Sequence, residues 1–158
     1  MGFQVSRWMA ASPDAVFEAC ADFAGAAQRV DAIEQVEMLT DGPVGVGTRF
    51  LETRTMFGKA STEEMEVTQF EPGRSYTLEA DSCGSHFVSR LDFVPEREGC
   101  RVTMDMHARP LTLMAKLMSP MCWFMGGMMK KCLEQDLADV ERHLGASPAP
   151  LGGSGLVS

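Results

Sequence analysis

The 158-residue sequence predicts an α+β fold, in which two short helices follow the first of seven antiparallel strands and a long helix closes the chain. Three observations support this. The N-terminal residues alternate apolar and polar side chains, residues 33–109 carry closely spaced turn signals, and an apolar stripe with helical spacing lies near the C-terminus. Short connections without intervening helices indicate antiparallel hairpins rather than parallel βαβ units.

The first elements are predicted by periodicity and capping. Residues 2–8 alternate apolar and polar, as in a half-buried strand. Ser12 and Pro13 then form a typical helix start, with a capping hydroxyl before a proline at the first helical position. A second short helix is predicted over residues 24–31.

The central region predicts six further strands joined as a meander. The apolar and β-branched runs that indicate them lie at 36–39, 48–57, 62–70, 75–80, 87–93 and 101–108. The breakers between them lie at 41–43, 58–59, 71–73, 81–84 and 95–99, where Gly, Pro and Asp are frequent.

After Pro110 the pattern becomes helical. Ser119 and Pro120 repeat the earlier start signal, so the long helix is predicted to begin there and to end at Gly145. Its apolar stripe consists of Met125, Met129, Leu133, Leu137, Val140 and Leu144. We therefore expect one domain over residues 1–145 and a disordered tail over 146–158, which is rich in small residues and uncharged.

The amino-acid composition argues against several classes of function. The formal charge of −8 and the isoelectric point near 4.8 oppose binding to nucleic acid or to anionic lipid. The apolar segment 111–129 approaches the length of a membrane span, but Lys116 and the Ser119-Pro120 break favour an amphipathic core helix. We expect no transmembrane segment.

The five cysteines form no CxxC pair, and neither they nor the three histidines show the spacing of metal ligands. No metal site or other cofactor is therefore expected. The chain shows no secretory signal pattern, and unpaired thiols fit a reducing compartment, which predicts a cytoplasmic protein.

Four local motifs resemble those of one superfamily. They are residues 11–17 (ASPDAVF), 42–50 (GPVGVGTRF), 70–74 (FEPGR) and 99–103 (GCRVT). Together with the element order they resemble the START-like, or SRPBCC, superfamily, which includes the polyketide cyclase/dehydrase group. The resemblance implies a helix-grip fold, in which a curved sheet wraps around the long C-terminal helix and a cavity can lie between them. One departure is the absence of tryptophan from residues 27–31.

Strand and helix parity predicts which side chains face such a cavity. The candidate ligand-binding residues are Phe50, Met56, Met65, Tyr76, Phe87, Leu91, Met104, Met106, Met118, Met121 and Met125. Eight of the thirteen methionines lie between Met104 and Met129, and methionine suits a surface that adapts to varied apolar ligands. The alternative is that these methionines simply fill the core.

The third strand leaves its orientation open. Phe50, Glu52, Arg54 and Met56 share one face, and the resemblance favours Phe50 and Met56 inward near the cavity mouth. An inward Glu52–Arg54 pair would be a costly buried ion pair, so a solvent-side salt bridge is the ordinary expectation. Tyr76, Glu52 and Arg54 are the weak catalytic candidates, while His86 and His107 fall on the predicted outer face.

These observations favour binding of a small apolar or aromatic molecule in the cavity, because no inward histidine or acid pair is expected. The first alternative is a polyketide cyclase/dehydratase-like enzyme, with Tyr76 and either Glu52 or Arg54 assisting. The second is a partner-binding module that docks through residues 111–129. The oligomeric state stays open, a homodimer included.

Overall fold

The computed structural model describes residues 2–56, 58–82, 84–111, 113 and 119–146. It confirms the α+β class and the predicted element order. The elements are β1 (Gly2–Met9), α1 (Pro13–Ala21), the 3-10 helix η1 (Phe23–Gly25), α2 (Ala26–Arg29), β2 (Ile33–Met38), β3 (Arg49–Met56), β4 (Lys59–Glu71), β5 (Ser75–Ser82), β6 (Ser85–Glu96), β7 (Gly99–Pro110) and α4 (Ser119–Ala146). The prediction of a disordered tail concerns residues outside the described part, apart from Ala146, which ends α4.

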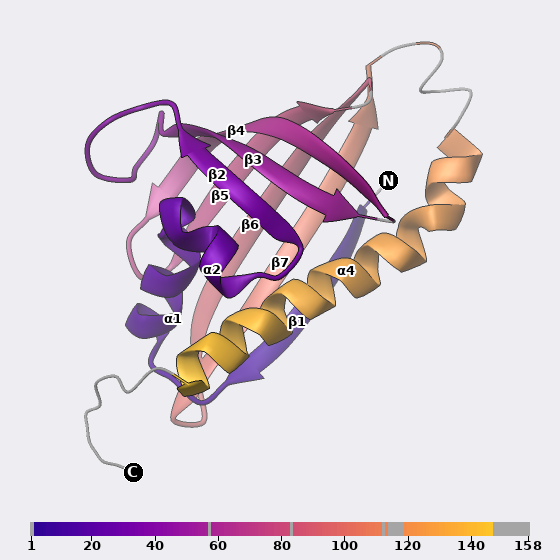
Figure 1. The fold of residues 1–158 in the computed structure, drawn as a ribbon. Helices are drawn as coiled ribbons and strands as arrows, with labels where there is room; N and C mark the ends of the chain where they lie inside the picture. The colour runs from indigo at the N-terminus through magenta and orange to yellow at the C-terminus, as the bar shows by residue number, and fades with distance from the viewer. Residues whose placement is uncertain (1, 57, 83, 112, 114–118, 147–158) are drawn as a thin grey trace.

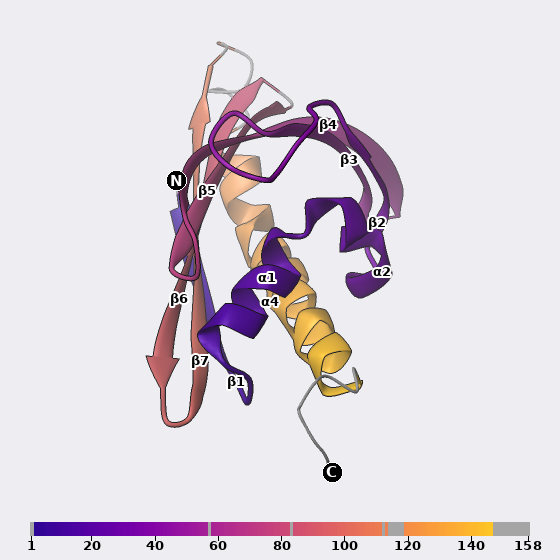
Figure 2. The ribbon, with the colours of Figure 1, turned by 90° about the vertical axis from the view of Figure 1, so that its left-hand side faces the viewer.

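The strands form one antiparallel sheet in the order β1-β7-β6-β5-β4-β3-β2. The meander runs from β2 to β7, and β1 adds to its far side by pairing with β7. The sheet curves strongly, and α4 lies inside the curve, as Figure 2 shows. Helices α1 and α2 lie near the C-terminal end of α4 (Figure 1). Among the described residues no helix is long and apolar enough to span a bilayer.

Helix α1 begins as its sequence predicts. The Ser12 hydroxyl accepts a hydrogen bond from the Ala15 amide at 3.1 Å, and Pro13 occupies the first turn. Phe17 then lies edge-on to three rings of the sheet, those of Phe70, Tyr76 and Phe93, with centroids 5.2–5.9 Å away. This aromatic cluster seats α1 on the sheet and fills one end of the core.

The turns are shorter, and the strands longer, than the turn-forming residues in the sequence predict. The turn between β6 and β7 contains only Arg97 and Glu98, both with positive φ, instead of the whole stretch 95–99. Pro95 is therefore part of β6 and pairs with Cys100. It is tolerated because β5 begins at Ser75, opposite Asp92, so no strand needs its missing amide on that side.

A bulge in β4 changes which residues of that strand face inward. The register shifts between Val67 and Gln69, so that Val67 opposes Leu78 and Phe70 opposes Tyr76. Odd-numbered residues face inward before the bulge and even-numbered residues after it, because one extra residue reverses the alternation. Val67 consequently lies in the core, and the partly buried Phe70 packs against it.

Helix α4 is fixed to the start of β2 by Asp139. This residue is 1% exposed, and its carboxylate accepts hydrogen bonds from the Asp31 amide at 3.1 Å and from Gln135 Nε2 at 2.9 Å. Arg142 Nη2 lies 3.4 Å from the same carboxylate. The turn before β2 is thus hydrogen-bonded to the helix as well as packed on it.

Replacing this carboxylate should destabilise the fold. In Asp139→Ala the Asp31 amide loses its buried acceptor, which should lower the free energy of unfolding by about 1–3 kcal/mol. Urea unfolding followed by circular dichroism measures this. The control is Glu141→Ala, which removes only the exposed ion pair with Arg7 and should cost under about 1 kcal/mol. Equal losses in the two variants would contradict the role given to Asp139.

Candidate functional site

A cavity of about 440 Å³, partly open to solvent, lies between the concave side of the sheet and helix α4. Most of its wall is apolar and comes from β4, β5, β6 and β7, from α4 and from the α2 region. Engineered cavities of about 150 Å³ bind benzene, so this cavity has room for roughly three such rings. Its volume lies within the ordinary range of small-molecule sites, about 300–1,000 Å³.

Six of the residues predicted to bind a ligand lie in the cavity wall, namely Met65, Tyr76, Phe87, Leu91, Met104 and Met106. Phe50 instead lies in the core, 1% exposed, with its ring stacked on Phe23 at a centroid distance of 4.7 Å. Met118 lies outside the described residues, and the side chains of Met56, Met121 and Met125 lie outside those that the structure describes.

One part of the wall is charged. Arg54 on β3 places Nε 3.2 Å from Glu52 Oε2 and Nη1 2.8 Å from Asp136 Oδ2 on α4. The three side chains are only 11–16% exposed, and all of them line the cavity together with Glu63 of β4. The guanidinium therefore connects the strand wall of the cavity to its helix wall.

Burial and like charges perturb the acids of this cluster. The pKa of Asp136 is raised from 3.8 to about 6, chiefly by burial and also by the charges of Glu52 and Asp139, against the opposing effect of Arg54. Burial and the charge of Glu52 also raise the pKa of Glu63. A carboxyl group that titrates near pH 6 can hold or release a proton under physiological conditions.

Two expectations from the sequence are corrected here. The Glu52–Arg54 pair faces the cavity rather than solvent, because Phe50 fixes the inward face of β3 and parity carries residues 52 and 54 with it. The expectation of no acid pair in the cavity is also wrong. Asp136 on α4 supplies a third charged partner, so the ion pair is part of a larger cluster rather than isolated.

A second polar feature lies near α2. Arg29 is 6% exposed and lines the cavity. Its Nη2 donates to the Asp22 carbonyl at 2.5 Å and its Nη1 to Asp22 Oδ2 at 3.2 Å, whereas its buried Nε has no partner among the described residues. An N–H group in this situation is a donor that a ligand acceptor could satisfy.

The two other titratable groups of the wall are poorly suited to proton transfer. Burial raises the pKa of the Cys20 thiol to about 12, so it is not an activated nucleophile. Burial also raises the pKa of Tyr76 well above 10, and its hydroxyl donates only a long hydrogen bond, 3.4 Å, to the Cys20 carbonyl. Of the groups in the cavity, Asp136 is therefore a better candidate acid or base than Tyr76.

Asp136, Glu63 and Arg29 are not among the site residues predicted from the sequence. Two of them carried a signal, because Asp136 falls on the apolar stripe beside Leu133 and Leu137, and Glu63 shares strand parity with Met65. A charged residue on a face otherwise apolar is costly unless it is paired, and that cost is the clue. Arg29 ends α2 and offered no such pattern.

The histidines lie away from the cavity. His86 sits on the outer face, where its ring nitrogens bind Asp81 at 2.6 Å and Glu79 at 2.8 Å, and these hydrogen bonds raise its pKa. His107 and His143 are exposed. Within the described part of the chain, no three His, Cys, Asp or Glu side chains are arranged to hold a metal ion.

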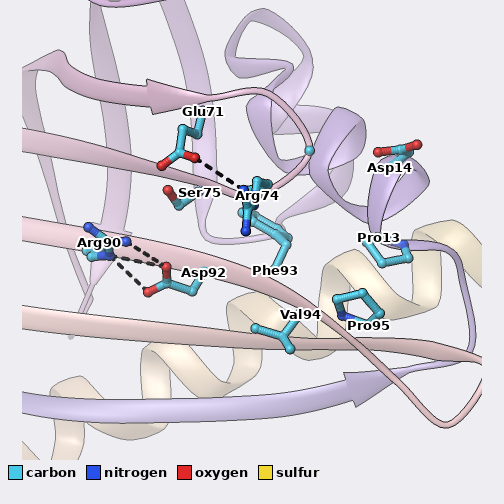
Figure 3. A pocket seen from close by; sticks show the side chains of 11 residues that line it. Pro13, Asp14, Glu71, Arg74, Ser75, Arg90, Asp92, Phe93, Val94 and Pro95 are labelled. Atoms are coloured by element: carbon cyan, nitrogen blue, oxygen red, sulfur yellow. Dashed lines mark hydrogen bonds and ion pairs between the residues drawn. The ribbon is translucent and has the colours of Figure 1, made fainter.

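A second hollow of about 570 Å³ lies on the surface between α1, the β4–β5 turn and β6. Figure 3 shows two ion pairs there, Arg90 with Asp92 and Arg74 with Glu71. Arg74 and Glu71 are 80% and 65% exposed, so their charges are well solvated. The cavity between the sheet and α4, with its buried charges, is the stronger candidate site.

Comparison with known proteins agrees with this geometry. Residues 2–144 match the family described as "Polyketide cyclase / dehydrase and lipid transport", which confirms the resemblance to the START-like superfamily. A search of curated proteins gives no match. The family and fold suggest hydrophobic ligand binding or polyketide cyclase-like activity.

Solved structures share the fold at low sequence identity. The protein TTHA0849 from Thermus thermophilus has a TM-score of 0.75 at 18% identity, over 93% of this chain and 100% of that one. A START superfamily protein from Mycobacterium smegmatis has a TM-score of 0.74 at 14% identity, over 90% and 98%. The di-domain ARO/CYC BexL from the BE-7585A biosynthetic pathway has a TM-score of 0.76 at 17% identity, over 94% of this chain and 51% of its own.

The raised pKa of Asp136 makes stability depend on pH. Between about pH 4 and pH 6 the folded protein holds a proton at Asp136 that the unfolded chain releases. This contribution to the free energy of unfolding is complete below about pH 4 and is lost as the pH rises through about 6. At about 1.4 kcal/mol per pKa unit it amounts to about 3 kcal/mol.

Asp136→Asn removes the titrating group. The unfolding free energy of the wild type, measured relative to that of the variant in urea, should therefore fall by about 3 kcal/mol between about pH 4 and pH 7. The titration of acids distant from Asp136 is common to both proteins and cancels in the difference. A difference that stays constant over this pH range would show that the pKa of Asp136 is not raised.

Proposed function

The chain belongs to the family of polyketide cyclases/dehydrases and lipid-transport proteins, and we propose that it binds a small apolar or aromatic molecule between the sheet and α4. One observation carries the proposal, the cavity of about 440 Å³ with an apolar wall and a few polar groups on one part of it. Apolar surface supplies affinity at about 25 cal/mol per Å² buried, and the polar groups orient the ligand.

The wall suits ligands of varied shape. Met65, Met104 and Met106 contribute flexible, polarizable side chains from β4 and β7. Phe87 and Leu91 of β6 contribute apolar side chains that are less flexible than methionine. We expect ligands of two or three rings, or an aliphatic equivalent, rather than a single small group. The free thiols of Cys20, Cys100 and Cys132 are consistent with action in a reducing cytoplasm.

Filling the cavity tests the proposal. Ala80 is 8% exposed and lines the wall, so a phenyl ring in Ala80→Phe should occupy ligand volume. Binding of the neutral fluorescent probe N-phenylnaphthylamine should weaken by about tenfold or more. The same substitution at exposed Ala60 on β4, Ala60→Phe, should leave binding unchanged.

Circular dichroism would verify that both variants fold. Equal probe affinity in the wild type and both variants would place the probe outside the cavity. Native mass spectrometry of the purified protein provides a second test, because a mass excess that disappears on denaturation identifies a bound small molecule and its size class.

A second candidate function, acid–base catalysis, is favoured by the pKa of about 6 for Asp136 in an apolar cavity. A carboxylate there can remove a proton from carbon in a substrate held by the wall, as cyclisation and dehydration of a polyketide-like chain require. Arg54 would polarise a carbonyl group of the substrate. Asp136, rather than Tyr76, would act as the acid or base.

A model proton transfer tests this without knowledge of the substrate. Nitrobenzisoxazole loses its ring proton to a base while its N–O bond breaks, which releases a coloured cyanophenolate. If Asp136 is the base, the rate should rise with pH through about 6 and should fall at least tenfold in Asp136→Asn. Tyr76→Phe should retain the activity. A rate unaffected by Asp136→Asn would exclude this residue as the base.

A further inference from the structure

We propose that the cavity selects apolar ligands that carry a neutral carbonyl oxygen, and that this oxygen accepts a hydrogen bond from Arg29 Nε. The inference rests on the proposed binding function and names its ligand class. Three features of the wall carry it: a buried donor without an acceptor, a second donor close to it with only a long hydrogen bond, and guanidinium groups that already have carboxylate partners.

Arg29 is the donor that lacks an acceptor. It ends α2, is 6% exposed and lines the cavity, and its buried Nε has no partner among the described residues. A buried N–H group without an acceptor is destabilising, and a ligand oxygen that satisfies it relieves this cost. A small rotation of the side chain, which is common on binding, would present the N–H group to the ligand.

Tyr76 supplies a second donor in the same part of the wall. The charge of Arg29 acts on the pKa of both Tyr76 and Cys20, against the effect of burial, so these three side chains of the wall lie close together. The Tyr76 hydroxyl donates to the Cys20 carbonyl at 3.4 Å, which is longer than an ordinary O–H···O hydrogen bond of about 2.5–3.0 Å. A carbonyl oxygen has two lone pairs, so one ligand oxygen can accept from both donors.

The guanidinium groups of the wall lack acceptors rather than carboxylate partners. Arg29 has Asp22 Oδ2 at 3.2 Å. Arg54 has Glu52 Oε2 at 3.2 Å and Asp136 Oδ2 at 2.8 Å. The contact at 2.8 Å is an ion pair that lies off the direction of the N–H bonds, so the buried Arg54 Nη1 also makes no hydrogen bond among the described residues. A neutral oxygen can satisfy such a donor without adding charge to the cavity.

A carboxylate and a hydrocarbon each fit this wall less well. A carboxylate must lose the hydration of a full charge in a mostly apolar cavity, beside the acids Glu52 and Asp136. A hydrocarbon avoids that cost, but it displaces water that could hydrogen-bond to Arg29 Nε and offers no acceptor in its place. A ketone of the same shape is therefore predicted to bind tighter than either.

Three probes of nearly the same shape measure this preference. Acetylnaphthalene, isopropenylnaphthalene and naphthoate share a two-ring body and carry a ketone, an alkene and a carboxylate group. Displacement of N-phenylnaphthylamine at pH 7.5 gives their affinities, and we expect the ketone to bind about tenfold tighter than the other two. Alkene binding as tight as ketone binding, or tightest binding of naphthoate, would overturn this inference and leave the binding function intact. No binding of N-phenylnaphthylamine or of any probe would overturn both.

Replacing Arg29 locates the effect. Arg29→Met keeps a long side chain but removes the N–H groups, so the preference for the ketone over the alkene should shrink about fivefold or more, while the alkene affinity stays unchanged. Arg49→Met is the matched control, since Arg49 on β3 is 48% exposed, pairs with Glu64 at 3.1 Å and is not part of the cavity wall. A ketone preference that is equal in both variants would show that the oxygen binds elsewhere and would overturn the inference. Thermal denaturation would verify that both variants fold, and the probe series on the wild type tests the preference independently of them.

Discussion

The contact between Arg54 and Asp136 joins the two walls of the cavity. Elsewhere α4 packs on the sheet through apolar side chains such as Leu133, Leu137 and Val140, but at this point a charged pair connects β3 to the helix. Removing a partner from a buried pair of this kind typically costs about 3–5 kcal/mol, because the remaining charge stays desolvated. The contact therefore maintains the separation of helix and sheet while keeping hydrogen-bonding groups at the surface of the cavity. A more fully apolar junction would allow the two walls to close together and remove the space.

The remaining anchors of α4 leave that space intact. Asp139, one turn after Asp136, accepts the Asp31 amide and fixes the helix to the turn before β2. Near the C-terminal end of the helix, Glu141 pairs with Arg7 on β1. Successive turns of the helix thus contact opposite margins of the curved sheet, while the middle of the sheet is left to the cavity wall. The aromatic cluster around Phe17 closes the core at the end next to α1. Polar contacts at the margins hold the helix in position without filling the space.

The fold was readable from the sequence because its signals are local. Alternation, capping at Ser12 and turn residues each determine a short segment, and antiparallel hairpins need few residues to close. The charged part of the site was not readable in the same way. Glu52 and Arg54 could be paired by parity, but the third partner lies more than eighty residues away on another element, and only tertiary packing brings Asp136 to them. The bulge after Val67 likewise changes the inward face of β4 through its pairing with β5, which no local pattern records.

The size of the cavity implies an energetic cost if the cavity is left empty. A closed cavity left empty in a rigid core costs about 24 cal/mol per Å³, so for about 440 Å³ roughly 10 kcal/mol is an upper bound, because this cavity opens to solvent. That is comparable with the whole stability of a domain of this size, about 5–15 kcal/mol. The polar cluster reduces the cost, because water can hydrogen-bond to Arg54 and to the carboxyl groups, but the apolar part of the wall offers water no such partners. A ligand with an apolar body and one polar end would satisfy both parts of the wall, and the proposed binding function requires a ligand of this kind.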